Sequence, residues 1–309
     1  MDPIVSVVIP TYNREAQFLR CLESVTRQNY PKNDYEIIAV HDGKHCDYDA
    51  KRIKEILAAV PGSQFLTVSH RGVSGVRNKG ISKSRGRLVL CIDDDCIADP
   101  NWIISFVKYM SGSPKTIAAG GQVIAAKPQS YVQKYIAFKE LLARPVRDRY
   151  GQITTLITAN VCFRRQVLLS VGGFNQKIPY AGGEDLDISI RLRSLGALGY
   201  CESARVQHEH RSTLRGLILQ HIAYGRGTYL ACRNNSIDYL DLKFYKPTIW
   251  GFGRYTVYVV KRIFVVSLPE FYRKQLVWYN WLPYVVLDVL RKMSFNIGAT
   301  LEYYQSKTS

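Results

Sequence analysis

Apolar, β-branched runs alternate with amphipathic segments along the first hundred residues of the chain. Residues 5–10 form the first such run, and Asn13 behind it is a candidate N-cap for a helix over residues 14–28. The same pattern predicts further strands at residues 35–40, 64–68 and 87–92, and further helices at residues 50–59 and 73–84. Such alternation is typical of an α/β fold, in which a mostly parallel sheet is flanked by helices on both faces.

Beyond residue 101 the alternation is less regular. We expect helices at residues 102–110, 131–142 and 166–171, and extended segments at residues 117–125, 158–163 and 204–207. From about residue 243 the composition changes to tyrosine, tryptophan and basic residues. We therefore predict one α/β domain over residues 1–242 and a helical C-terminal tail over residues 243–309.

The carboxyl ends of the expected strands are the first place to look for a site, because open α/β sheets bind ligands there. The polar residues at these ends are Thr11, Tyr12, Asp42, Asp93, Asp94 and Asp95. Composition agrees with a folded domain that binds an anion. The chain has 309 residues, 47% of them hydrophobic, and its 42 lysines and arginines against 25 acids give a net charge of +17. A nucleotide, a nucleic acid or an acidic membrane surface would each suit that charge.

Cysteine usage and apolar stretches indicate a cytoplasmic location. The seven cysteines are odd in number and form no C-x-x-C pair, which favours reduced thiols over disulfides or a zinc site. The N-terminus lacks the order of a signal peptide. The longest apolar stretches, 255–268 and 276–290, are interrupted by polar residues and fall short of the roughly 20 residues that a spanning helix needs.

Three consecutive acids, Asp93, Asp94 and Asp95, directly follow an apolar strand. Adjacent like charges repel one another, and carboxylates at alternate positions can share one hard divalent cation that also takes diphosphate oxygens. The motif therefore predicts a Mg²⁺ or Mn²⁺ site. The alternative is a solvated acidic turn in front of a helix, for which Asp99 alone would serve as the cap.

A second acidic element, GGEDLD at residues 182–187, contains Glu184 and Asp185. Acids are common at helix starts, but the paired glycines let the backbone approach something closely, which favours a functional site. An acid there could act as general base for an acceptor hydroxyl. His208 is either a further metal ligand or an ordinary surface histidine.

Several other polar residues are candidates for binding a nucleotide. Asp42, at a strand end before Gly43, is either an acceptor for a base or ribose or simply a turn residue. Basic candidates for phosphate contacts are Arg71, Arg77, Lys79 and Arg164, although most arginines of a basic protein are solvated.

Taken together, these motifs resemble the inverting family 2 glycosyltransferases, whose A-type fold is a Rossmann-like nucleotide-binding sheet. The resemblance runs from Val5 to about Gly227 and rests on residues 7–13 (VVIPTYN), 41–43 (HDG), 72–80 (GVSGVRNKG), 93–95 (DDD), 172–174 (GGF) and 183–185 (GED). His41 and Lys44 depart from the family's Asp-Asp-Gly-Ser pattern. Each motif alone is a weak signal, and their order and spacing make the assignment.

The resemblance implies a role for each motif. Nucleotide-sugar binding falls to Pro10, Thr11, Tyr12, Asn13, Asp42, Arg71, Arg77, Asp93 and Asp94. Metal binding falls to Asp95, with Asp93 and His208, and catalysis to the pair Glu184 and Asp185, with Asp185 as base. The implied donor is a nucleotide diphosphate-sugar, first of all a UDP-sugar. The implied acceptor is a hydroxyl of a glycan or lipid-linked glycan.

Two other functions compete with this interpretation. A sugar-phosphate nucleotidyltransferase should carry a glycine-rich basic loop after the first strand, which residues 10–13 (PTYN) lack. A non-catalytic nucleotide-sugar-binding or nucleic-acid-binding protein would explain the charge. Nucleic acid is nevertheless not an expected partner, because no recognisable module is present and clustered acids repel phosphate.

The tail is predicted to contact an anionic membrane on its cytoplasmic face. Residues 243–309 contain ten basic and three acidic residues, 10 − 3 = +7, with Trp250, Trp278 and Trp281 among them. Interspersed aromatic and basic residues are typical of segments at the headgroup level. The alternative is a small helical subdomain that packs on the catalytic core.

Overall fold

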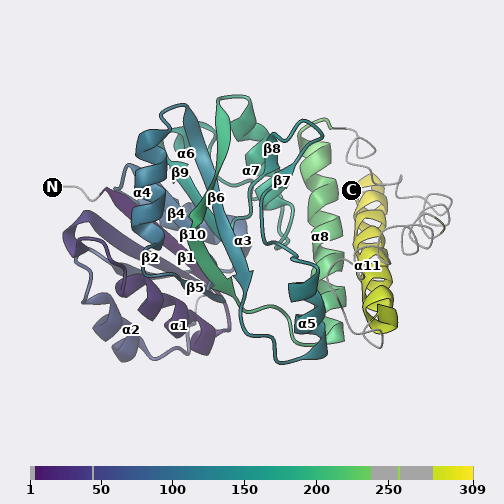
Figure 1. Ribbon diagram of the computed structural model, residues 1–309, viewed down its shortest axis with the longest axis horizontal. Coiled ribbons are helices and arrows are strands. Elements are labelled where there is room, and N and C mark those ends of the chain that lie inside the picture. Colours follow the sequence, from purple (N-terminus) through teal and green to yellow (C-terminus); the bar gives the residue numbers. More distant parts are fainter. Residues whose placement is uncertain (1–3, 44, 238–256, 258–280, 309) are drawn as a thin grey trace. The chain divides into compact units, whose positions relative to one another are not determined.

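The computed structural model describes residues 4–43, 45–237, 257 and 281–308 (Figure 1). The chain divides into two compact units. Unit 1 comprises Met1–Lys127, Glu140–Pro179 and Asp185–His210, and unit 2 comprises Pro128–Lys139, Tyr180–Glu184 and Arg211–Ser309. The predicted domain boundary between residues 242 and 243 lies outside the described residues.

Unit 1 is built on an eight-stranded sheet with the order β3-β2-β1-β4-β9-β6-β10-β5. Its strands are β1 (Val5–Thr11), β2 (Tyr35–Asp42), β3 (Gln64–Val68), β4 (Leu88–Ile92), β5 (Cys96–Ala98), β6 (Thr116–Ala125), β9 (Asn160–Arg164) and β10 (Ala197–His208). A separate pair is formed by β7 (Val146–Arg147) and β8 (Ile153–Thr155). Strands β1 to β4 run parallel, with Val8 opposite both Ile38 and Cys91. Their carboxyl ends therefore share one edge of the sheet.

The second half of the sheet is mixed. Strand β9 is antiparallel to both β4 and β6, and β5 is antiparallel to β10. Asn160, at the start of β9, donates to the carbonyls of Gln122 and Ala204 and accepts from Trp102 Nε1. These bonds tie the start of β9 to β6, β10 and Trp102, which come from distant parts of the chain. The predicted parallel arrangement holds for β1 to β4 and for β6 with β10.

Apolar side chains cover both faces of the sheet. On one face α1 (Glu15–Thr26), α2 (Ala50–Leu57) and α4 (Trp102–Gly112) bury residues such as Phe18 and Trp102. On the other face α3 (Gly72–Lys83), α6 (Arg165–Ser170) and α7 (Glu184–Arg193) bury residues such as Val76, Leu168 and Ile188. Burial of these two apolar layers is the main driving force for the fold of unit 1.

The first helix begins one residue later than the sequence indicates. Asn13 has a φ of 51° and lies in the left-handed region, which asparagine tolerates better than most residues. The N-cap of α1 is Arg14, with a φ of −140° and no side-chain capping bond. The prediction of Asn13 as the N-cap is therefore wrong, because its backbone turns the chain before the helix starts.

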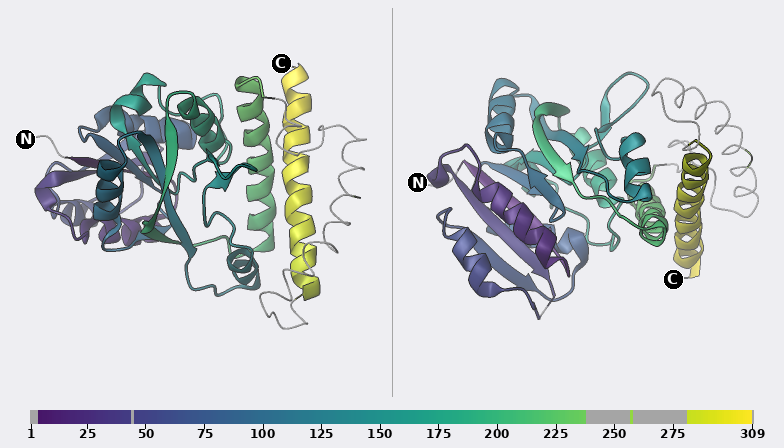
Figure 2. Two further views of the ribbon diagram at one scale, coloured as in Figure 1. Left: turned by 45° about the horizontal axis from the view of Figure 1, so that its top comes forward. Right: turned by 60° about the horizontal axis from the view of Figure 1, so that its bottom comes forward.

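Unit 2 consists of α5 (Tyr131–Phe138), α8 (Leu214–Asn234) and α11 (Trp281–Thr308), and α8 lies alongside α11 (Figures 1 and 2). Two glycines bring these helices into backbone contact. A Cβ on Gly225 would lie 1.8 Å from the Phe295 carbonyl oxygen, and a Cβ on Gly298 would lie 2.0 Å from that of Ile222. No larger residue fits at either glycine without separating the helices.

A buried polar cluster also joins α11 to α5. The Asp288 carboxylate accepts hydrogen bonds from Tyr135 Oη at 2.9 Å and Arg291 Nη2 at 2.8 Å, and it pairs with Lys292 Nζ at 2.6 Å. Although burial opposes it, the attraction of the two cations holds the pKa of Asp288 well below its usual range. The C-terminal helix is thus an integral part of unit 2. None of the helices in the described residues is both long and apolar enough to cross a membrane.

Candidate active site

The three aspartates occupy the turn between β4 and β5, at the edge where the parallel strands end. Asp94 is completely buried, and the side chains of Asp93 and Asp95 are 27% and 11% exposed. Burial raises the pKa of Asp94 to about 7, against the opposing attraction of Arg14. The motif is therefore not the solvated acidic turn that the sequence left open.

Two arginines neutralise much of this acidic motif. Arg14 places Nη2 2.8 Å from Asp94 Oδ1 and pairs through Nη1 with Asp95 Oδ2. Arg77, a predicted phosphate partner, is 2% exposed, lies over the Phe174 ring and places Nη2 2.7 Å from Asp93 Oδ1. Repulsion among the aspartates is thus partly offset within the protein. Repulsion among the three aspartates is therefore weaker evidence for a metal ion than it is in the sequence alone.

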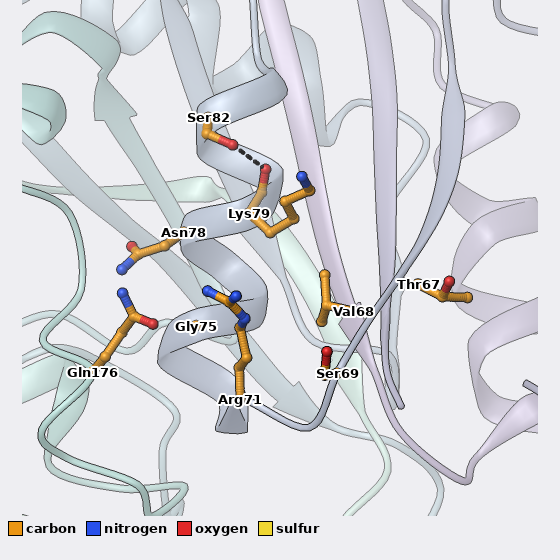
Figure 3. Close-up of a pocket in the computed structure, with 9 residues that line it drawn as sticks. All are labelled: Thr67, Val68, Ser69, Arg71, Gly75, Asn78, Lys79, Ser82 and Gln176. Atoms are coloured by element: carbon orange, nitrogen blue, oxygen red, sulfur yellow. Dashed lines mark hydrogen bonds between the residues drawn. The ribbon is translucent and has the colours of Figure 1, made fainter. Parts of the chain in front are cut away.

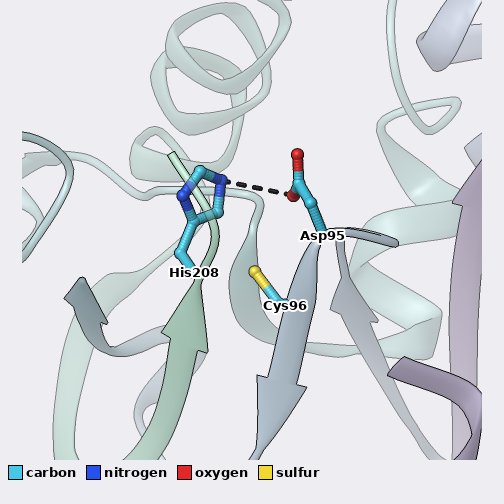
Figure 4. Close-up of side chains that lie close together, drawn as sticks. All are labelled: Asp95, Cys96 and His208. Atoms are coloured by element: carbon cyan, nitrogen blue, oxygen red, sulfur yellow. Dashed lines mark ion pairs between the residues drawn. The ribbon is translucent and has the colours of Figure 1, made fainter. Parts of the chain in front are cut away.

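A group of possible metal ligands comes from β10, β5 and the turn in front of β5 (Figure 4). Antiparallel pairing of β10 with β5 places His208 opposite Cys96, next to Asp95. Ligand atoms of these three residues lie within 4.8 Å of one another, and His208 Nε2 is 3.3 Å from Asp95 Oδ1. Burial holds the pKa of the Cys96 thiol well above its usual range, so the thiol stays protonated and is a poor ligand.

A carboxylate and an imidazole remain, and this donor set suits Mn²⁺, which accepts both oxygen and nitrogen. Asp95 and His208 therefore fit the predicted cation. Asp93, predicted as a further ligand, does not join this group in the structure, because its carboxylate faces Arg77.

A second histidine orients the first. The Nδ1 atoms of His208 and His210 are 2.9 Å apart, a distance at which one donates to the other. Burial and the neighbouring His208 lower the pKa of His210 to about 3, so His210 is neutral. Burial also lowers the pKa of His208, but the Asp95 carboxylate outweighs it and the net shift is upward. A partner on the remote ring nitrogen is the usual way in which a ligating histidine is held.

The loop behind β1 has one buried and one exposed side. Pro10 pairs with Val40 inside the sheet, and Thr11 is buried with its hydroxyl 3.1 Å from Tyr48 Oη. Tyr12 is 46% exposed, and its ring centroid lies 5.1 Å from that of His70. An exposed aromatic ring at the sheet edge offers a surface on which a nucleobase can stack.

Asp42 holds the start of α3. Its Oδ1 accepts from the amide of Arg71 at 2.7 Å and its Oδ2 from that of Gly72 at 3.1 Å. Oδ2 also lies 3.5 Å from His70 Nδ1, so the second lone pair of Oδ1 is the one left for a ligand. The Arg71 side chain points along α3 into a pocket of about 380 Å³, which Lys79 also lines (Figure 3). Neither head group forms an ion pair with the described residues, so the pocket is basic.

The glycine pair before Glu184 has a structural explanation. Gly182 and Gly183 have φ values of 121° and 93°, and a Cβ on Gly183 would lie 2.1 Å from the carbonyl carbon of Gly227 in α8. The backbone at these two glycines thus approaches helix α8 of unit 2 closely. The Glu184 carboxylate accepts from the Gly182 amide at 2.6 Å. Asp185 is half-buried in the first turn of α7, and its role as base stays a prediction.

Sequence patterns gave no role at this site to Arg14 or Tyr48, and of His208 and His210 they selected only His208 as a ligand. Tyr48 lies in an irregular segment, accepts from the Arg14 amide at 2.7 Å and has no local signal. His210 differs little in its sequence context from His208. Arg14 did carry a signal, since a cation at a helix start opposes the helix dipole.

A relative that is named for its activity matches most of the chain. A glucosyl-dolichyl phosphate glucuronosyltransferase of Haloferax volcanii is 27% identical over 238 residues, which cover 72% of this chain and 75% of the relative.

Solved structures show the same fold. A mannosyltransferase of Pyrobaculum calidifontis, solved with GDP-Man and Mn²⁺, has a TM-score of 0.67 at 16% identity and covers 99% of this chain and 88% of its own. Residues 1–349 of TarS from S. aureus, solved with UDP, give a TM-score of 0.54 at 17% identity, covering 100% of this chain and 92% of theirs. These likenesses confirm the predicted A-type fold. The profile of glycosyl transferase family 2 matches residues 6–172, more than half of the sequence, so the chain belongs to that family and is a glycosyltransferase.

Proposed function

We propose that this glycosyltransferase is metal-dependent and transfers a sugar from a nucleotide diphosphate-sugar to a hydroxyl acceptor by a single inverting displacement. The observation that carries the metal dependence is the approach of His208 Nε2 to Asp95 Oδ1 at the sheet edge. A bound Mn²⁺ or Mg²⁺ would supply positive charge for the departing diphosphate. The mannosyltransferase of similar fold was solved with Mn²⁺.

The chain's own residues would bind the donor and move the proton. Tyr12 would stack on the base, and the second lone pair of Asp42 Oδ1 would accept a hydrogen bond from it. Asp95 and His208 would hold the cation. Asp185 would remove the acceptor proton as the oxygen attacks the anomeric carbon. A single displacement needs no covalent sugar intermediate, so no nucleophile is required of the protein.

The donor is proposed to be a UDP-sugar, by family resemblance. A donor screen tests this directly. The protein is incubated with UDP-, GDP- and dTDP-sugars and Mn²⁺, and release of free nucleoside diphosphate is followed. We expect slow hydrolysis of UDP-sugars that disappears on chelation and in Asp95→Ala. Turnover of Asp95→Ala at the wild-type rate would show that Asp95 does not hold the metal. Selective hydrolysis of GDP-sugars would show that the donor base is guanine and not uracil.

The role of Asp185 is tested by Asp185→Asn. We expect donor affinity to stay close to that of the wild type while turnover with acceptor falls by roughly 10²–10⁴-fold, the usual effect of losing a general base. Donor hydrolysis and donor binding, measured on the same sample, are the internal controls. An equal loss of donor binding would show that Asp185 is structural.

The acceptor is proposed to be a glycan, free or lipid-linked, presented at a membrane. The Haloferax relative is named for a dolichyl phosphate-linked substrate. Charge in the described part of unit 2 supports a membrane surface. Its acids, Glu184, Asp288 and Glu302, are all buried, so that the exposed charges are positive. Those exposed cations are Lys134, Arg211, Arg215, Arg233 and Lys307. Each contributes about 1 kcal/mol near an anionic bilayer.

Vesicle sedimentation with the full chain tests this. Because α11 packs on α8, a chain cut near residue 242 would lose part of a folded unit and prove little. The better variant is Arg215→Glu with Arg233→Glu and Lys307→Glu. Its control is the equal charge change on exposed Lys51, Lys54 and Lys83 of unit 1. Wild type and control should pellet with anionic vesicles at low salt and release as salt rises. Equal pelleting of both variants would place the membrane contact elsewhere.

A further inference from the structure

The guanidinium of Arg14 bridges two carboxylates of the acidic motif. Nη2 lies 2.8 Å from Asp94 Oδ1, and Nη1 pairs with Asp95 Oδ2. The other oxygen of Asp95 faces His208 Nε2. The residue expected to be the principal ligand of the divalent cation is therefore already bound, on one oxygen, to a cation of the protein itself.

This bridge is built into the fold. Arg14 is the N-cap of α1, and its amide donates to Tyr48 Oη at 2.7 Å. The Tyr48 ring packs against Phe18 with a centroid separation of 5.8 Å. The backbone of Arg14 is thus held by half-buried Tyr48, which packs on buried Phe18, and its planar fork reaches two carboxylates at once. A lysine cannot reproduce this geometry, because its donors are all on one nitrogen.

The charges around the three aspartates indicate what the Arg14 bridge does. Asp93, Asp94 and Asp95 carry three negative charges when ionised, and Arg14 and Arg77 carry two positive charges, so −3 + 2 leaves −1. A divalent cation added while both arginines keep their contacts would bring the cluster to +1. An anionic nucleotide diphosphate would relieve that excess, so cation and nucleotide should bind together.

Taking the proposed divalent-cation site as given, we propose that Arg14 is an internal counter-ion of the acidic motif. It holds Asp94 and Asp95 in the cation-free protein and competes with the divalent cation for Asp95. The cation consequently binds weakly to the free enzyme and more tightly once a nucleotide diphosphate is present.

Mn²⁺ binding without substrate tests the proposal. Free Mn²⁺ is followed by its electron paramagnetic resonance signal for wild type, Arg14→Gln and Arg14→Lys, with and without UDP. A unit charge within several ångströms of the ion, at an effective dielectric constant of about 20, changes affinity roughly tenfold or more. Arg14→Gln should therefore bind Mn²⁺ at least about tenfold more tightly than wild type in the absence of UDP. UDP should tighten Mn²⁺ binding in wild type and have a smaller effect in Arg14→Gln.

Arg14→Lys keeps the charge but loses the fork, so its affinity should fall between the two, and it covers the case in which Arg14→Gln folds poorly. The matched control is Arg52→Gln, an equal charge change at an exposed arginine that pairs with Glu23. It should leave Mn²⁺ affinity unchanged.

Mn²⁺ affinity of both Arg14 variants equal to or weaker than that of wild type would overturn the counter-ion role. Asp95→Ala separates this from failure of the proposed function. If Asp95→Ala binds Mn²⁺ like wild type, the metal site itself is wrong and the inference falls with it. If it loses Mn²⁺ while the Arg14 variants match wild type, only the inference falls.

Discussion

Replacing Asp288 by asparagine removes the charge at the centre of the cluster that joins α11 to α5. The Asp288 side chain is 5% exposed, and those of its partners Arg291 and Lys292 are 19% and 22% exposed. Breaking a buried pair by neutralising one partner costs about 3–5 kcal/mol. Because both cations can reach some water, we expect the lower end, about 3 kcal/mol, or a fall of roughly 6–12 °C in the melting temperature.

The pH dependence of this effect has a definite sign. The pKa of Asp288 is depressed in the folded protein, whereas the unfolded value is about 3.9. A depressed acid contributes stability above its unfolded pKa and loses that contribution as the pH falls toward its folded pKa. The gap in stability between wild type and Asp288→Asn should therefore be full near neutral pH and narrow below about pH 4.

Thermal unfolding followed by circular dichroism from neutral to acidic pH measures both quantities. Asp47→Asn, which alters an exposed carboxylate of unit 1, is the control and should melt like wild type. A gap below about 1 kcal/mol at neutral pH, or one that does not change with pH, would refute the assignment of Asp288 as a charged, buried anchor of the C-terminal helix.

Three further substitutions probe the site. Gly227→Ala puts a Cβ 1.5 Å from the Gly182 carbonyl oxygen, so we expect a loss of about 1–3 kcal/mol in thermal stability, with acceptor turnover reduced more than donor binding. Tyr48→Phe removes the acceptor of the Arg14 amide and should cost about 0.5–1.5 kcal/mol by the same melts. Asp42→Ala leaves two amides at the start of α3 without their acceptor and should weaken UDP binding measured by calorimetry, whereas unchanged affinity would exclude Asp42 from the base pocket.

Local patterns predicted the elements of the first half well. Strand β3 has the predicted bounds, and α3 begins and ends one residue before its prediction, because apolar periodicity and the flanking glycine and serine are local properties. The direction of β9 depends on partners in β4 that lie 68 to 76 positions earlier in the chain, and β5 pairs with β10 across 108 to 112 positions. Periodicity along the chain contains no information about such partners.

The same limit applies to the site. The sequence marked Asp95 and His208 separately, and only the β10–β5 pairing brings their side chains together. Asp93 resembled its neighbours in every local respect, yet it faces Arg77 rather than the ligand group. The backbone of this one turn sets the direction of each aspartate side chain, and that direction decides which cation the aspartate contacts. Residue type alone does not reveal these directions.

Two broken local rules in this sequence have different explanations. Gly182 and Gly183 interrupt a region that leads into a helix, and close packing against Gly227 accounts for them without any ligand. Arg14 places a cation at a helix start, which costs about 0.3–1 kcal/mol through the helix dipole. Close packing does not explain Arg14, because its side chain is 29% exposed and its guanidinium contacts two carboxylates. Leaving a buried polar group without its partner costs about 1–3 kcal/mol, so the pairing with buried Asp94 outweighs the dipole. The unfavourable cation at the start of α1 therefore indicates a role for Arg14 in the chemistry of this enzyme. The glycines before α7, in contrast, are explained by helix packing alone.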